Sequence, residues 1–166
     1  MGKTALQRRA DLLNKYSKQI IECLNKCLID EPIKIKGLKF SYEWNYQHTG
    51  YDVFANFDFS NKSSINRDFP TQFFFDGSLR DLQNSIGDRA YFLNVGIDRL
   101  VGVDIKDVPS ARNFIKDIEK EKQFFEKLTI AFCGLPYSSI KRELIEQAPE
   151  RTDADLTFHK PKSQGR

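Results

Sequence analysis

Residues 38–59 read LKFSYEWNYQHTGYDVFANFDF, and this stretch decides the fold. On each side of its centre, large apolar residues alternate with polar ones, which is the period of two expected of a half-buried strand. The polar residues 47–50 separate the two runs and predict a hairpin loop. In the hairpin that this loop closes, Tyr46 faces Tyr51 and every further pair on that face is apolar.

The aromatic side chains of this stretch occupy one face of the predicted hairpin. The same register places Lys39 opposite Asp58 on the other face, so the pairing of opposite charges supports the register that the apolar pairs indicate. Core packing is the simpler interpretation of the aromatic face, and a base-stacking platform is the alternative. Core packing is favoured because the carboxylates of Glu43, Asp52 and Asp58 on the other face would repel phosphate. The aromatic residues are Phe40, Tyr42, Trp44, Tyr46, Tyr51, Phe57 and Phe59.

Hydropathy patterns predict helices and further strands outside the hairpin. Apolar residues three or four apart predict an amphipathic helix over residues 4–29. Ser78 and Ser110 are the expected N-caps of two later helices, and Gly87 is the expected stop of the first of these. Residues 128–133 fit either a continuation of the second helix or a buried strand. The other predicted elements are helices over residues 79–86, 111–127 and 138–147, and strands over residues 71–75, 91–97 and 100–106.

These elements predict an α+β fold: an antiparallel sheet of about five strands, with the N-terminal helix and the C-terminal helices packed on one face. The length of 166 residues fits one domain, which we expect to span residues 1–147. Residues 148–166 are polar, with Leu156 and Phe158 as their only large apolar residues. They are predicted to form a flexible tail.

Composition narrows the class of protein. With 40% hydrophobic and 30% charged residues, the chain is neither collagen-like nor disordered nor a disulfide scaffold. No run approaches ~18 consecutive apolar residues, and the charged N-terminus lacks the apolar region of a signal peptide. We therefore expect a soluble cytoplasmic protein without a membrane partner. The three cysteines include no CxxC pair and are expected to be reduced thiols.

The sequence LVGVDIK, residues 100–106, carries the one candidate for metal chemistry. Residues two apart on a strand share a face, so Asp104 would hold Mg²⁺ while Lys106 stabilises charge on an attacked phosphate. The pattern resembles the PD-(D/E)xK nuclease family, with Asp88 as the upstream acid, although Gly87 stands where that family has a proline. The resemblance implies a Mg²⁺-dependent nuclease with Asp88 and Asp104 as metal ligands and Lys106 as the third catalytic residue.

The register of the predicted strands 91–97 and 100–106 decides whether these residues meet. A two-residue turn between the strands would leave Asp88 roughly 16 Å from Asp104, too far to share one metal ion. A wider loop centred on Gly96 would bring Asp88 opposite Asp104 instead. The alternative is that Asp104 and Lys106 are a structural charge pair.

Three functions from different classes follow from these patterns. The favoured one is a non-enzymatic interaction module, of the immunity, inhibitor or accessory type, that docks on another protein without a cofactor. It is favoured because the sequence displays no complete catalytic set. Its candidate binding residues are Glu43, Asp52 and Asp58. The nuclease is the first alternative, and it alone requires Mg²⁺.

The second alternative is a nucleic-acid-binding protein that uses the basic N-terminal helix. Phosphate-binding domains concentrate basic residues on one face, and this helix is the only candidate patch of that kind. The net charge of +3 for the whole chain is small for such a function. The basic residues of the helix are Lys3, Arg8, Arg9, Lys15 and Lys18.

Overall fold

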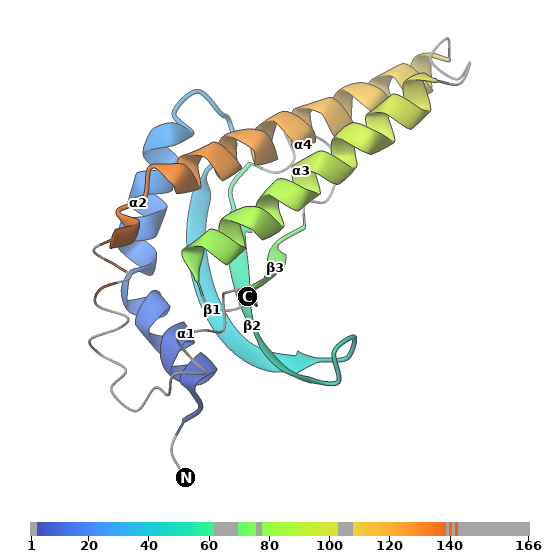
Figure 1. The fold of residues 1–166 in the computed structure, drawn as a ribbon. Helices are drawn as coiled ribbons and strands as arrows, with labels where there is room; N and C mark the ends of the chain where they lie inside the picture. The colour runs from blue at the N-terminus through green and yellow to red at the C-terminus, as the bar shows by residue number, and fades with distance from the viewer. Residues whose placement is uncertain are drawn as a thin grey trace.

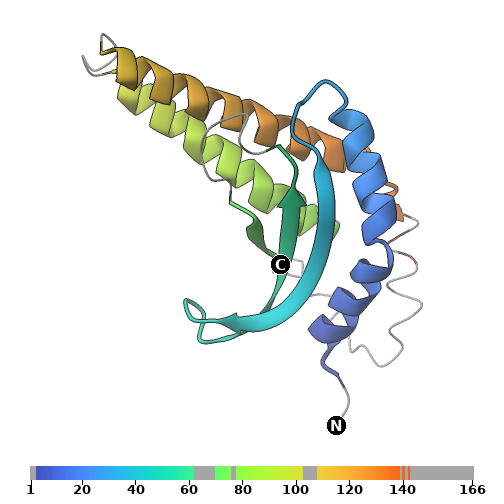
Figure 2. The same ribbon diagram turned by 180° about the vertical axis from the view of Figure 1, so that it is seen from behind.

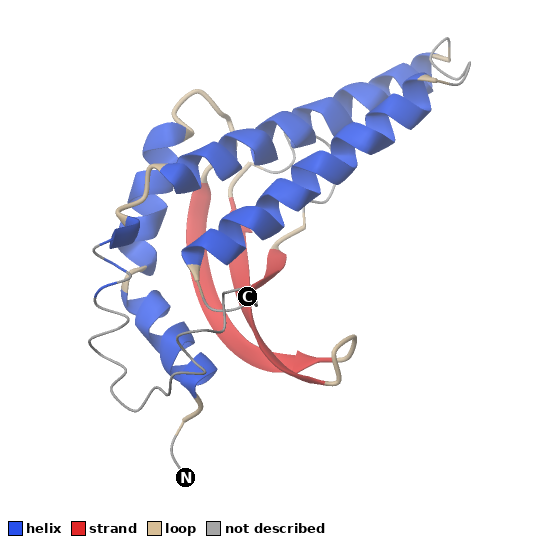
Figure 3. Ribbon diagram, in the orientation of Figure 1, coloured by secondary structure: helices blue, strands red, loops and turns tan. Residues whose placement is uncertain are grey.

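The structure is a computed structural model that describes residues 3–61, 70–75, 78–102, 108–138, 140 and 142. These residues form an α+β fold in which helices and an antiparallel sheet are separate layers (Figures 1 and 3). The elements are α1 (Ala5–Lys15), α2 (Ser17–Cys27), β1 (Ile35–Asn45), β2 (Gly50–Phe59), β3 (Gln72–Phe75), α3 (Leu79–Val101) and α4 (Pro109–Cys133).

The sheet has three strands in the order β1-β2-β3, and both pairings are antiparallel. The prediction of about five strands is therefore wrong for the described part of the chain. Residues 91–97 lie inside α3, and so do Leu100 and Val101. Residues 103–107, which hold the rest of the predicted fifth strand, lie outside the described residues.

Helix α3 continues through Gly87, which was the predicted stop of a helix, and through Gly96, which was the centre of the alternative hairpin loop. Its buried positions Ile86, Ala90, Leu93 and Ile97 follow one another at steps of four, three and four, which is the helical period. Glycine inside a helix costs only about 1 kcal/mol, less than the burial of one large apolar side chain contributes. Ser78 is the N-cap as predicted, and its side chain accepts a hydrogen bond from the Asp81 amide.

The hairpin of β1 and β2 forms with the predicted faces but in a different register. Trp44, not Tyr46, faces Tyr51, and Lys39 faces Asn56 rather than Asp58. The loop is residues 46–49, one residue earlier than predicted. The pairing has slipped by two residues, and a slip of two preserves which side chains share a face. Hydropathy therefore could not distinguish the two registers.

The predicted N-terminal helix is two helices that meet at Tyr16. Thr4 begins α1 with a capping box, in which its side chain and that of Gln7 exchange hydrogen bonds with each other's backbone amides. At Tyr16 the backbone leaves the helical region, with φ −97° and ψ 0°, and α2 starts at the next residue. Figure 1 shows that the two helices follow the bend of β1.

Helix α4 starts earlier and ends later than predicted. Pro109 occupies its first turn, where the missing N–H costs nothing, and Val108 rather than Ser110 is the N-cap. Of the two alternatives for residues 128–133, the helical continuation is correct, and it ends at Gly134 as expected. Tyr137, Ser138, Ile140 and Arg142 are helical, while the remainder of the predicted last helix and residues 148–166 lie outside the described residues.

Phenylalanines dominate the core between the sheet and the helices. Phe40 of β1 meets Phe75 of β3, with ring centroids 5.4 Å apart. Phe59 contacts Phe124 of α4 at 5.5 Å, and Phe73 contacts Phe125 at 5.8 Å. Each buried side chain of this size contributes about 1.5–3 kcal/mol. The sheet and α4 are therefore held together mainly by aromatic packing.

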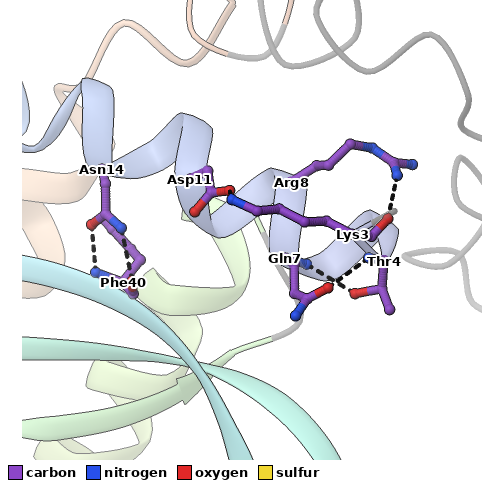
Figure 4. Close-up of polar contacts among 7 residues, drawn as sticks. All are labelled: Lys3, Thr4, Gln7, Arg8, Asp11, Asn14 and Phe40. Atoms are coloured by element: carbon purple, nitrogen blue, oxygen red, sulfur yellow. Dashed lines mark hydrogen bonds and ion pairs between the residues drawn. The ribbon is translucent and has the colours of Figure 1, made fainter. Parts of the chain in front are cut away.

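Two asparagine side chains satisfy the free edge of β1. The Asn14 amide donates to the Phe40 carbonyl oxygen at 2.8 Å and accepts from the Phe40 N–H at 2.7 Å (Figure 4). Asn25 of α2 does the same at Ile35, with distances of 2.9 and 3.0 Å. An edge strand exposes unpaired N–H and C=O groups that invite another strand. Helices α1 and α2 thus cover this edge and supply the bonds of a missing strand.

We predict that Asn14→Ala lowers the free energy of unfolding by about 1–3 kcal/mol, because it leaves an N–H and a C=O of Phe40 without partners. Urea denaturation followed by circular dichroism measures the change. Asn113→Ala is the matched control, since Asn113 is exposed on α4 and undergoes the same change in helix propensity. Equal stability of the two variants would show that the edge bonds contribute nothing.

A buried ion pair joins α3 to α4. The Glu121 side chain is fully buried, and Arg89 donates to its Oε2 through two guanidinium nitrogens, with Nε at 2.9 Å. Both nitrogens donate to the same carboxylate oxygen, and hydrogen bonds between charged groups are stronger than those between neutral ones. Removing one partner of a buried pair is far more damaging than replacing both with apolar side chains of similar volume.

We expect Arg89→Leu to destabilise the chain by about 3 kcal/mol, because it leaves the Glu121 carboxylate buried without its main cation. The double variant Arg89→Met with Glu121→Leu should return to within about 1 kcal/mol of the wild type. Thermal denaturation of both variants tests this, with Arg112→Leu as an exposed control on α4. A double variant as unstable as Arg89→Leu would refute this explanation.

Candidate docking surface

The sheet buries one face only. From Leu38 onward, every buried side chain of the three strands lies in one alternating phase and belongs to the core shared with the helices, and none in the opposite phase is buried. At Ile35 an irregularity in the register of β1 shifts this phase. Seen from behind, no described helix passes in front of the strands (Figure 2). We call this uncovered side the outer face. It carries Lys39, Ser41, Glu43, Asn45, Asp52, Phe54, Asn56, Asp58, Gln72 and Phe74.

Hydrogen bonds organise the polar part of the outer face. Glu43 and Asp52 are direct cross-strand partners. Gln72 donates to Glu43 at 3.3 Å and to Asn56 Oδ1 at 2.9 Å, and Ser41 also donates to Glu43. Because like charges in direct register repel, these donors are what makes the pairing of the two carboxylates tolerable.

Asp52 is held in place by two partners from the hairpin loop side. Asn45 Nδ2 donates to its Oδ2 at 2.9 Å, and His48 Nδ1 lies 3.1 Å from the same oxygen. The Asp52 side chain is 19% exposed, whereas that of His48 is 54% exposed. Both contacts reach the same carboxylate oxygen, and both come from residues that line a neighbouring hollow.

Aromatic rings form that hollow beside the two carboxylates. Phe54 and Phe74 lie 6.1 Å apart, and the His48 ring meets Phe74 edge-on at 5.1 Å. The hollow has a volume of about 400 Å³. Its lining consists of Trp44, Asn45, Tyr46, Gln47, His48, Phe54, Gln72 and Phe74. This combination offers apolar contact surface, amide groups and adjacent negative charge, which suits a cationic side chain next to an apolar one.

The predicted aromatic core is correct only near the base of the hairpin. Phe40, Phe57 and Phe59 are buried. Further out, Tyr46 is 85% and Tyr51 55% exposed, because the hairpin extends beyond the helices that cover its base (Figure 1). Tyr42 stacks on Tyr51 at 5.0 Å, and Trp44 meets Tyr51 edge-on at 5.4 Å.

The structure separates the three predicted binding residues. Glu43 and Asp52 lie together, whereas Asp58 lies six residues further along β2, opposite Gly37. Sequence reasoning missed Phe54, Phe74 and His48. A signal was present, because Phe54 falls in the polar phase of β2 and a run of three phenylalanines in β3 must place one on the outer face.

The basic residues of the predicted N-terminal helix are divided between the segment before α1, α1 itself and α2. Lys3 pairs with Asp11, and Arg8 donates to the Lys3 carbonyl oxygen at 2.7 Å (Figure 4). Lys15 ends α1 and Lys18 belongs to α2, on the other side of the break at Tyr16. Nucleic-acid binding by Lys3, Arg8, Arg9, Lys15 and Lys18 stays a prediction.

The nuclease residues are only partly within the described chain. Asp88 is exposed in the middle of α3, not before a strand as predicted. Asp104 and Lys106 lie outside the described residues, so their role stays a prediction. Where the structure describes side chains, it contains no group of three histidine, cysteine or acidic residues that could hold a metal ion.

A second cluster of polar side chains links α3 to the end of α4 and to the residues that follow it. Gln83 donates to Cys133 Sγ at 2.9 Å and accepts from the Tyr137 hydroxyl at 3.3 Å. The Arg80 guanidinium lies over the Tyr137 ring, 4.9 Å from its centroid. Burial raises the pKa of Tyr137 to about 12, and Arg80 acts in the opposite direction.

The raised pKa of Tyr137 predicts a loss of stability in alkali. The fold favours the neutral phenol, so its contribution is complete below pH 10 and is lost as the pH rises from 10.0 to about 12. Unfolding free energies measured across this range should fall more steeply in the wild type than in Tyr137→Phe. Tyr46→Phe, which alters an exposed tyrosine, should keep the wild-type slope.

Comparisons of the chain with protein-family models, with curated proteins and with solved structures gave no match. Within the described residues, no helix is both long enough and apolar enough to cross a membrane.

Proposed function

We propose that this chain is a non-enzymatic docking module that binds another protein through the outer face of its sheet. One observation carries the proposal: the uncovered face combines an aromatic hollow with two carboxylates, Glu43 and Asp52, that are held in position by neighbouring amides. Interfaces are enriched in aromatic side chains, and positioned polar groups at their edge provide specificity.

The chemistry of the face defines the partner. Phe54 and Phe74 supply apolar area at little entropic cost, because aromatic side chains have few rotatable bonds. Glu43 and Asp52 attract a cation, for which arginine is the best match, since its planar guanidinium binds carboxylates in a bidentate manner. The partner segment therefore presents an arginine beside an apolar residue. Phosphate, by contrast, would be repelled by the same two carboxylates.

Trp44 makes the proposal measurable in solution. It is the single tryptophan of the chain and lines the hollow, so its fluorescence reports on occupancy of this surface. Selection from a random peptide-display library against the folded chain should enrich peptides with arginine next to an apolar residue. Titration of these peptides should change the Trp44 emission.

We predict that Glu43→Gln combined with Asp52→Asn weakens binding of the selected peptides by about tenfold or more, because the cation loses both partners. Phe74→Ala should weaken it as well, by removing one wall of the hollow. Asp58→Asn is the control, since it lies on the same face but away from the hollow. An equal loss for Asp58→Asn, or enrichment of acidic peptides, would contradict the proposal.

A further inference from the structure

A groove of about 530 Å³ lies along the junction of α3 and α4, and all the residues that line it belong to these two helices. Phe124 and Phe125 of α4 contact the strands, whereas Lys122, Glu126 and Ile130 succeed one another every four residues along a different face of the helix. The complete lining is Gly87, Ala90, Tyr91, Asn94, Lys122, Glu126, Thr129 and Ile130.

Small residues form the floor of the groove and exposed apolar residues form its walls. A Cβ atom at Gly87 would lie 3.5 Å from Thr129 Cγ2, so the two helices approach closely at this level. Tyr91 is 63% and Ile130 69% exposed, and the Tyr91 ring contacts that of Phe92, itself 67% exposed. Contiguous exposed apolar side chains rimmed by charges mark interaction surfaces.

The charges of the groove are self-complementary. Lys122 and Glu126 are four residues apart on α4, and neither forms an ion pair with another side chain in the described part of the chain. A twofold axis that crosses α4 between these residues runs a second α4 antiparallel to the first. It places each Lys122 opposite the Glu126 of the other copy, so both charges gain a partner at once.

We infer that the occupant of this groove is a second copy of the chain, and that the α3 and α4 hairpins of two copies pack into an antiparallel four-helix arrangement. Two adjacent helices of this length offer a face of roughly 700 Å². A surface of side chains has more accessible area than its projection, so this face has room for the ~800 Å² per partner of a stable interface. The inference concerns a different surface from the proposed docking face and goes beyond that function.

Charge reversal tests the inference with the full chain. The wild type should form a dimer in sedimentation-velocity runs at concentrations up to about 100 µM. Lys122→Glu and Glu126→Lys should each raise the dimer dissociation constant by about tenfold or more, because each creates two like-charge contacts across the axis. An equimolar mixture of the two variants should dimerise again, because one copy then carries two glutamates and the other two lysines.

Lys120→Glu is the matched control, since it makes the same charge change at an exposed position of α4 outside the groove. Circular dichroism confirms that each variant is folded. A wild type that stays monomeric overturns the inference. So does a dimer that both reversals leave intact, or one that the mixture of variants does not restore.

Discussion

The free edge of β1 is the constraint on which the arrangement of this fold depends. A three-stranded sheet leaves two edges, and unpaired backbone groups on an edge strand either find partners or recruit another chain. Asn14 and Asn25 resolve this at Phe40 and Ile35 with paired amide hydrogen bonds. Because the two asparagines lie on different helices, the break at Tyr16 allows both to reach a strand that bends.

This edge also explains why one face of the sheet stays open. Helices α1 and α2 pack beside β1, and α3 and α4 cover the remaining core side, so no described helix is left for the outer face. The hairpin then extends beyond all of them, which exposes Trp44, Tyr46 and Tyr51. The alternation of aromatic residues in β1 continues beyond the part of the strand that the helices cover. The same pattern therefore places Phe40 in the core and Trp44 at the surface.

The sequence was sufficient for the hairpin and for the α+β class, because alternation at a period of two is a strong local signal. It was insufficient for α3. Tyr91, Phe92 and Val95 are apolar residues outside the buried stripe, and together with Gly87 and Gly96 they obscured a helical pattern that is regular at Ile86, Ala90, Leu93 and Ile97. Tertiary packing against α4 overrides the local preference of those glycines.

The candidate surface was harder to predict than the fold, because it depends on register and on neighbours. Glu43 and Asp52 were recognised as acidic residues of one face, but a slip of two residues changes which side chain lies opposite each of them. The contribution of Gln72 and Phe74 comes from β3, which residues 60–71 separate from β2 in sequence. No local sequence pattern reveals the pairing of β2 with β3.

The two proposed interaction surfaces are compatible because the helical layer lies between them. Contacts made through Lys122 and Glu126 leave Glu43 and Asp52 on the outer face of each copy open to solvent. A dimer built in this way carries two docking faces joined rigidly through four helices. When one docking face binds a partner that has several arginine-containing segments, the effective concentration of the remaining segments at the other docking face rises. Modest affinity at a shallow hollow becomes sufficient for stable attachment, provided that the partner is itself multivalent.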